Sequence, residues 1–343
     1  MSTKKVSMKQ IAEKLNISPG AVSLTLNGRG DEMRIADETQ RLILETAKEM
    51  GYPLEKVRKN RQTIGVNDLP VVVVFMPALK GDVISPYDRV MNGLNECIKD
   101  KDVNVEIIVC PFEYGSLFKK YKYISTSFCT GAIIFSLSEK DMEDLMNADF
   151  DIPIVLFNRI NNKYSTVYVD DYNVGYNVAK LFHSHWCKKA SIFTPDYRNK
   201  PMMLRKIGFE DGCRDYNISL QKKHNVFCKT EDKAIDEYVS AMCDEGDIPD
   251  MIFANIDDIG LSLIKALKNN NINVPDDVKL ISYGDNAWIK AVTPAMSSIR
   301  LDVEKMSGEC LALLWNLIKS GDWSPIAKIF QSEFVFRDSF KEV

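Results

Sequence analysis

From residue 71 onward, short apolar runs alternate with longer amphipathic stretches. The clearest apolar runs are predicted strands at 71–76, 105–109, 131–135, 152–157, 191–193, 251–254 and 278–283. Continuously apolar strands separated by helices, such as the helix expected at 87–100, are typical of parallel sheets covered on both faces. About ten such strands predict an α/β fold with two doubly wound parts and a cleft at the carboxyl ends of the strands.

The first fifty residues follow a different pattern, one of short helices. Ser7 and Gln10 fit a capping box, and Ser18 followed by Pro19 predicts the start of a second helix. A third helix is expected at 37–50. The apolar positions expected to face inward on the first and third helices are Met8, Ile11, Ala12, Leu15, Leu42, Ile43, Ala47 and Met50. The pattern predicts a three-helix head with a helix-turn-helix, a motif that reads DNA.

Charge is divided unevenly between the head and the rest of the chain. Residues 1–60 hold 11 Lys and Arg against 8 Asp and Glu, whereas the remainder holds 33 against 40. A basic head on an acidic body suits a protein that presents one end to phosphate.

Several other classes of protein are disfavoured by what the sequence contains. The 8 cysteines are scattered without a C-x-x-C pair, which argues against a zinc site or a disulfide scaffold and indicates a reducing compartment. No apolar leader or membrane-spanning run is evident, so we expect a cytoplasmic protein with no membrane partner. Dinucleotide, P-loop and hydrolase motifs are also absent from the sequence, so no enzyme, cofactor or metal site is expected.

One extended motif covers the second helix and its ends. It reads Ile17-Ser18-Pro19-Gly20-Ala21-Val22-Ser23-Leu24-Thr25-Leu26-Asn27-Gly28, with Glu38-Thr39 and Met50-Gly51-Tyr52 following. The motif resembles the head of the lac-repressor/gal-repressor (LacI/GalR) family of bacterial transcription regulators.

The body continues the resemblance in the right order. The matching stretches are Asn158-Arg159, Val169-Asp170-Asp171 with Gly175, Arg205 to Phe209, Val274 to Val278, Ser282 to Asp285, and Pro294 to Arg300. The resemblance implies a head at 1–55, a basic hinge at 56–70 and an effector-binding and dimerisation body at 71–343. It further implies a periplasmic-binding-protein-like body with an N-lobe at about 71–165 and 300–330 and a C-lobe at about 166–298 and 331–343.

The same resemblance implies contacts with an operator. The residues expected to bind DNA are Ser18, Pro19, Gly20, Ser23, Leu24, Thr25, Asn27, Thr39 and Tyr52 in the head, and Lys56, Arg58, Lys59 and Arg61 in the hinge. Pro19, Gly20 and Leu24 hold the reading positions, and none of them can form a bidentate hydrogen bond to a base. The hinge lacks the leucine that family members wedge into the minor groove, so we expect its charges to act as a basic arm on phosphate.

The resemblance also implies a small ligand, a carbohydrate, in the cleft between the lobes. The residues expected to bind it are Tyr87, Asn158, Arg159, Arg205, Asp257 and Asp285, with Arg205 the strongest candidate. Gly284 and Met203 replace polar residues of the family, so a regulator of the same fold with a non-sensing pocket is the alternative.

A ligand that closes the body of a homodimer would change how two heads sit on a palindromic operator, which makes a repressor the expected function. An apolar stretch late in the chain, at 311–318, could serve the core or the dimer face, and the sequence does not separate these roles.

Overall fold

The computed structural model describes residues 6–26, 35–52, 69–78, 87–196 and 199–341. Its head consists of α1 (Met8–Leu15), α2 (Pro19–Leu26) and α3 (Asp37–Glu49). The predicted capping box is confirmed, because the Ser7 hydroxyl accepts from the Gln10 amide and the Gln10 side chain accepts from the Ser7 amide at 2.8 Å.

The head packs around its own small core. Ile11, Val22 and Ile43 are fully buried, and they belong to an apolar cluster made of head residues alone. The prediction that Leu42 faces inward is wrong, since its side chain is 49% exposed. Ile43 and Ala47, one turn apart, form the inward line of α3, and Leu42 lies beside that line.

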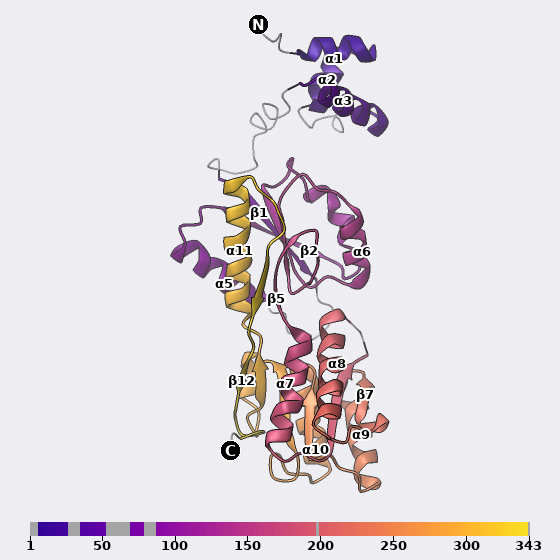
Figure 1. Cartoon of the computed structure of the whole chain (residues 1–343), viewed down its shortest axis with the longest axis vertical. Helices are drawn as coiled ribbons and strands as arrows, with labels where there is room; N and C mark the ends of the chain where they lie inside the picture. Colours follow the sequence, from indigo (N-terminus) through magenta and orange to yellow (C-terminus); the bar gives the residue numbers. More distant parts are fainter. Residues whose placement is uncertain (1–5, 27–34, 53–68, 79–86, 197–198, 342–343) are drawn as a thin grey trace.

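The first lobe of the body is a parallel sheet in the order β11-β5-β4-β3-β1-β2. Its strands are β1 (Val71–Pro77), β2 (Glu106–Phe112), β3 (Gly131–Ile134), β4 (Ile154–Phe157), β5 (Ser165–Val169) and β11 (Ala327–Phe330). Its helices are α5 (Tyr87–Asp100), the 3-10 helix η2 (Leu117–Tyr123), α6 (Glu139–Asn147) and α11 (Val303–Ser320). Helices α5 and α11 pack together on one face of the sheet, and α6 covers the other (Figure 1).

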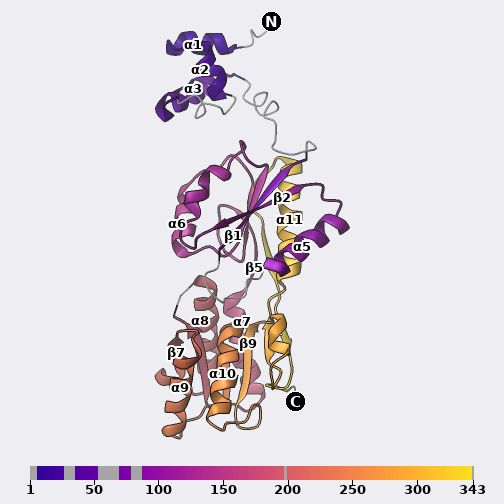
Figure 2. The ribbon, with the colours of Figure 1, turned by 180° about the vertical axis from the view of Figure 1, so that it is seen from behind.

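The second lobe repeats this architecture. Its sheet has the order β12-β10-β9-β8-β6-β7, with only β12 antiparallel. The strands are β6 (Ala190–Pro195), β7 (Asn225–Cys228), β8 (Met251–Ala254), β9 (Lys279–Gly284), β10 (Ser297–Arg300) and β12 (Glu333–Val335). The helices are α7 (Asp171–Ser184), α8 (Lys200–Asp215), η3 (Lys222–His224), α9 (Asp232–Asp244), α10 (Asp257–Asn269) and η4 (Ala287–Lys290). The fold is therefore the predicted α/β fold of two doubly wound sheets below a helical head (Figure 2).

The chain passes between the lobes after β5, after β10 and after β11. The expected lobe boundary at 165/166 is a few residues early, because β5 pairs with β4 and β11 and so belongs to the first lobe through Val169. Likewise β10 pairs with β9 through Arg300, which extends the second lobe to that residue.

Two glycines of the motifs let α7 and α8 lie in direct backbone contact. A Cβ added at Gly175 would meet the Arg205 carbonyl oxygen at 1.8 Å, and one at Gly208 would meet the Tyr172 carbonyl oxygen at 2.0 Å. These glycines therefore have a packing role. The start of α8 lies against the first lobe, where the Lys200 amide donates to Glu139.

The apolar stretch at 311–318 serves the core of the protomer. Leu311, Leu313, Leu314 and Leu317 on α11 are buried in the main apolar cluster, and Trp315 and Ile318 pack against it while partly exposed.

Candidate functional site

The start of α2 is exposed on the surface of the head. The Ser18 hydroxyl caps this helix by accepting from the Ala21 amide at 3.1 Å, while Pro19 and Gly20 are exposed beside it. Ser23 and Leu24 are half-buried one turn further on. The first turn of α2 is thus available to a partner, as a recognition helix requires.

Thr25 does not fit the role expected of it. Its side chain is 3% exposed, and its hydroxyl has no hydrogen-bond partner among the described residues. A hydroxyl buried inside the head does not reach a phosphate in this arrangement, so the structure does not support this contact. Thr25 lies on the inward face of α2 between Val22 and Leu26, which are also buried.

Two of the remaining residues expected to bind DNA, Thr39 and Tyr52, lie in the described part of the head. Thr39 is half-buried near the start of α3, and Tyr52 is a half-buried ring that packs against the head core. Asn27 and the hinge residues Lys56, Arg58, Lys59 and Arg61 lie outside the described residues.

A cavity of about 370 Å³ lies between the two lobes. The first lobe lines it with α6 and with the stretch after β4, and the second lobe with Asp171 and the start of α8. The lining residues used below are Glu139, Met142, Glu143, Asn158, Arg159, Ile160, Lys200 and Leu204. The volume is that of an ordinary small-molecule site, and its walls come from both lobes.

Asn158 and Arg159 are the expected ligand residues that line this cavity. Asn158 has a positive φ of 51°, and its side-chain oxygen accepts from the Val169 amide at 3.1 Å, which ties β4 to the end of β5. Arg159 is 8% exposed and donates to the carbonyl oxygens of Leu137 and Asn158. Burial lowers the pKa of the Arg159 guanidinium from its ordinary value, because the cation is removed from water.

Arg205, the strongest candidate from sequence, is held entirely by protein groups. It is 3% exposed, forms an ion pair with Asp171, and donates to the Asn255 side chain at 2.8 Å. Its guanidinium also lies 3.6 Å from the centre of the Tyr283 ring. The expected contact between Arg205 and a ligand therefore does not form in this arrangement, because its donors are directed at Asp171 and Asn255.

Asp257 is likewise enclosed by partners. The carboxylate is 1% exposed and accepts from the hydroxyls of Ser282 at 2.5 Å and Ser298 at 3.1 Å, and from the Asn286 amide at 2.8 Å. Burial raises the pKa of Asp257, and these donors oppose that shift.

The neighbouring Gly284 cannot carry a side chain in this conformation. Its φ is 137°, and a Cβ would come within 2.7 Å of the Asp257 carboxylate. The departure from the family's paired aspartates thus has a structural basis, since the space that a side chain at 284 would need belongs to Asp257.

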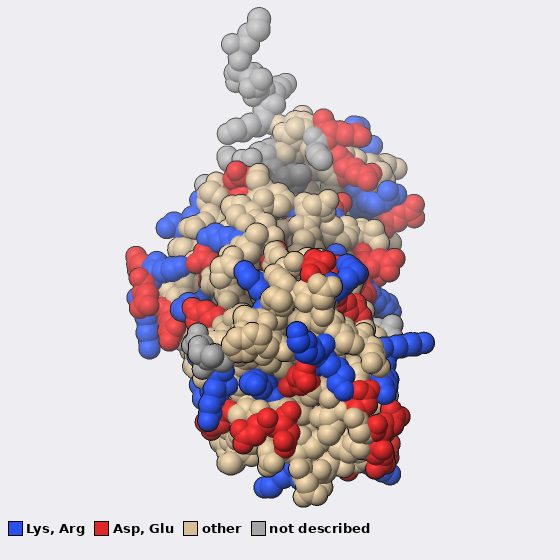
Figure 3. Space-filling model, turned by 60° about the horizontal axis from the view of Figure 1, so that its bottom comes forward, with Lys and Arg blue, Asp and Glu red and all other residues tan. Residues whose placement is uncertain are grey.

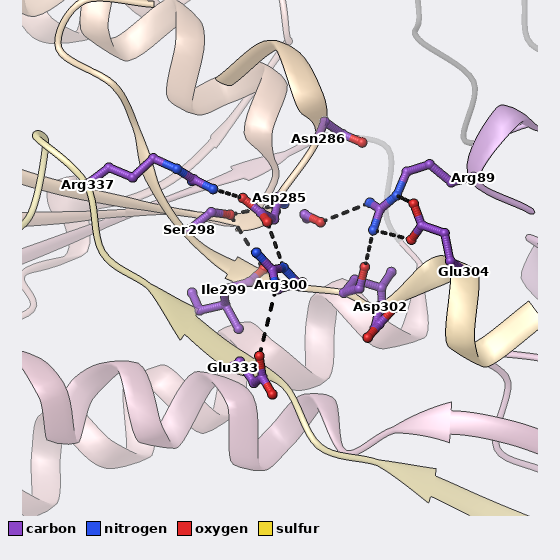
Figure 4. A network of polar contacts seen from close by, with 12 residues as sticks. Arg89, Asp285, Asn286, Ser298, Ile299, Arg300, Asp302, Glu304, Glu333 and Arg337 are labelled. Carbon is purple, nitrogen blue, oxygen red and sulfur yellow. Dashed lines mark hydrogen bonds and ion pairs between the residues drawn. The ribbon is translucent and has the colours of Figure 1, made fainter. Parts of the chain in front are cut away.

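Asp285 holds the crossover and the C-terminal segment together (Figure 4). Its carboxylate accepts from Arg300 Nε at 2.8 Å and from Arg337 Nη2 at 2.5 Å, and the residue is 6% exposed. Arg300 also approaches Glu333 of β12 at 3.9 Å. Asp285 therefore acts as an internal anchor in this structure and does not line the cavity.

Tyr87 begins α5 and is 41% exposed, outside the cavity lining. Close to it, Arg89 forms an ion pair with Glu304 of α11 at 2.8 Å and donates to the Gly284 carbonyl oxygen at 3.3 Å (Figure 4). This hydrogen bond joins the first lobe to the second at the carboxyl end of β9.

Sequence reasoning missed Glu139, Glu143 and Lys200, which line the cavity. A signal for them was present. Ser138 caps α6 and Asn199 caps α8, and each helix follows the carboxyl end of a strand, where doubly wound folds bind ligands.

Charged groups are mixed on the outer surface of the body. On the face shown in Figure 3, Lys and Arg side chains are interspersed with Asp and Glu. No group of side chains suited to a metal ion, and no helix long and apolar enough to cross a membrane, occurs within the described residues.

Comparison with known proteins gives consistent relatives. A family model described as a periplasmic binding protein-like domain matches residues 179–340. The chain is 23% identical over 338 residues to the HTH-type transcriptional regulator AscG of Escherichia coli, covering 97% of this chain and 98% of that protein. It is 22% identical over 342 residues to the probable HTH-type transcriptional repressor ExuR of Bacillus subtilis, covering 98% and 99%.

Solved structures show the same fold. A LacI family transcription regulator from Clostridium acetobutylicum is 26% identical, with a TM-score of 0.71, over 78% of this chain and 99% of that one. The complex of the transcriptional regulator CelR with cellobiose is 17% identical, with a TM-score of 0.69, over 98% of this chain and 100% of that one.

The helix-turn-helix head, the two-lobed body and these relatives define a DNA-binding transcriptional regulator, and the relatives named are regulators, not enzymes. Its relatives are HTH-type regulators and its structural neighbours include LacI family regulators, and the chain is similar to both along most of its length. The resemblance seen in its motifs is thereby confirmed.

Proposed function

We propose that this chain is a homodimeric repressor whose hold on a palindromic operator is controlled by a carbohydrate bound between the lobes. The observation that carries the proposal is the cavity lined by both lobes, with Arg159 on one side and Lys200 on the other. A ligand touching both walls favours one separation of the lobes, and the connections after β5, β10 and β11 transmit that preference. The described helix start at Ser18 to Gly20 supports a major-groove contact by each head.

A direct experiment measures operator binding by fluorescence anisotropy while sugars are added. Cellobiose is the first probe, because the related CelR was solved with it. The proposal expects at least one sugar to shift the operator Kd by fivefold or more, on the order of the usual coupling of about 1–3 kcal/mol. If no sugar in a broad panel changes the operator Kd, control by a carbohydrate is wrong.

The alternative of a non-sensing pocket has one observation in its favour. Arg205, Asp257 and Asp285 are all engaged with protein partners. A thermal-shift screen separates the alternatives, because a ligand that binds only the folded protein must raise Tm. A regulator with a non-sensing pocket would keep the same Tm throughout.

The basic hinge is proposed as an arm on the DNA backbone. Replacing Lys56, Arg58, Lys59 and Arg61 with Ala removes positive charges, so the dependence of log Kd on log salt should become shallower. An unchanged slope would rule out this role.

A further inference from the structure

We infer that the ligand of the interlobe cavity carries a negatively charged group, a sugar carboxylate or a sugar phosphate, held between Arg159 and Lys200. This inference rests on the function proposed above and names the chemical class of its ligand. It places the charged group between Arg159, which the family motifs indicated, and Lys200, which they did not.

The first support is the chemistry around Arg159. Its Nε and Nη2 donate to the Leu137 carbonyl oxygen at 3.0 and 2.6 Å, and its Nη1 donates to the Asn158 carbonyl oxygen at 2.8 Å. A guanidinium has more N–H donors than these contacts use. Among the described residues no carboxylate forms an ion pair with it. The side chains that most favour its charged form are Tyr114, which also forms a hydrogen bond with it, Glu139 and Asp171. A buried cation that lacks a bound anion favours a ligand that supplies one.

The second support lies on the opposite wall. Lys200 is the first residue of the 16-residue helix α8, and both its side chain and its amide stand at the positive end of that helix. The Lys200 residue is exposed and lines the cavity. The start of α8 therefore offers an anion a backbone N–H and an exposed cation on one side of the cavity.

The third support is that a carboxylate already occupies this position. Glu139 of α6 reaches across from the first lobe, and its Oε1 accepts from the Lys200 amide at 3.1 Å. It is also among the charges that stabilise the Arg159 cation. Because Glu139 is exposed, its side chain can move into water when a ligand anion takes over these contacts.

The rest of the lining suits the remainder of a sugar acid. Met142, Ile160 and Leu204 form apolar surface for the C–H face of a ring, while Asn158 supplies an amide. Arg205 is already paired with the Asp171 carboxylate, and Asp257 and Asp285 are themselves carboxylates, so none of them competes for an anionic group.

The test compares matched neutral and anionic sugars on the full-length protein. Tm and calorimetric Kd are measured with hexoses and cellobiose, with the corresponding uronic acids and 6-phosphates, and with inorganic phosphate and acetate alone. We expect an acidic sugar to bind at least tenfold more tightly than its neutral counterpart. Whether uronic acids or sugar phosphates respond identifies the source of the charge.

Two variants locate the contact. Lys200→Gln should weaken binding of the acidic sugar by about tenfold, the usual scale of one charge-assisted hydrogen bond. Glu139→Gln should strengthen it, because a competing carboxylate is removed. Lys180→Gln on α7 and Glu237→Gln on α9 change the same charges at exposed positions outside the cavity lining, and both should bind like the parent protein.

Two results would contradict the inference, and they differ in what they mean for carbohydrate control. If a neutral sugar binds as tightly as its acid, and Lys200→Gln leaves both unchanged, the anionic class is wrong and carbohydrate sensing stands. If no sugar of either kind alters Tm or operator binding, the proposed carbohydrate control fails and this inference fails with it.

Discussion

Arg89 on α5 donates to the carbonyl oxygen of Gly284 at the end of β9, at 3.3 Å, and so links the two lobes. The same guanidinium is fixed by Glu304 through two bonds of 2.8 Å. Gly284, which stands where the family has an aspartate, thus contributes its backbone carbonyl to the contact between the lobes.

Arg89→Ala should lower the free energy of unfolding by about 1–3 kcal/mol, because Glu304 loses a partly buried bidentate partner. Urea unfolding of the full chain measures this change. Lys101→Ala, one residue beyond the end of α5, is the control, since the Lys101 side chain is more exposed than that of Arg89 and Glu309, its partner at 3.0 Å, keeps Lys328. The control should cost less than about 1 kcal/mol. Equal losses in both variants would contradict a special role for Arg89.

Asp285→Asn should destabilise the protein far more than loss of the neighbouring Glu333. Removing the buried carboxylate leaves Arg300 and Arg337 without their shared anion, which costs about 3–5 kcal/mol in comparable buried pairs. Glu333→Gln removes only the 3.9 Å contact to Arg300 and should change stability by less than about 0.5 kcal/mol. Calorimetric Tm values for both variants check the order, and a reversed order would refute the anchor role of Asp285.

Thr25→Val should stabilise the head slightly, by up to about 1 kcal/mol, because it removes a buried hydroxyl without a partner and keeps the side-chain volume. The operator Kd should not change. Ser18→Ala, by contrast, removes the cap of α2 and should cost about 1 kcal/mol. If Thr25→Val weakens operator binding by about tenfold while the head stays folded, Thr25 contacts DNA and its buried position is not the one used there.

Asp247 should contribute to stability against acid. Hydrogen bonds from Lys189, Lys223 and His224 hold the pKa of this carboxyl well below its usual range. Since the folded pKa lies below the unfolded value of about 3.9, the contribution is complete above that pH and is lost as pH falls below it. Asp247→Asn should therefore lower Tm at pH 6 and reduce the fall in Tm between pH 4 and 2. If Tm falls by the same amount between pH 4 and 2 in the variant and the parent protein, these hydrogen bonds do not persist in solution.

The sequence predicted the local structure well where local rules decide it. The caps at Ser7 and Ser18 and the bounds of α5 followed from side-chain patterns within a few residues. The prediction that Leu42 faces inward was wrong because α3 has three adjacent apolar residues, and tertiary packing decides which of them is buried. The expected lobe boundary lay a few residues early because the pairing of β5 with β11 joins segments about 160 residues apart, and the sequence does not show that pairing.

The candidate site was harder to predict for the same reason. The motifs located Arg205 and Asp285, but their partners Asp171 and Arg337 lie 34 and 52 residues away along the chain. Sequence cannot show that these groups neutralise one another inside the fold. Nor could it show that α6 and α8 meet across the cavity, since Glu139 and Lys200 are 61 residues apart.

Sequence-specific DNA binding by a dimer can be measured by selection from randomised duplex DNA at physiological salt. The retained DNA should contain a two-fold palindrome of about 14–20 base pairs. Retention without an enriched motif, disappearing as salt rises, would mean attraction to phosphate alone and would contradict the claim.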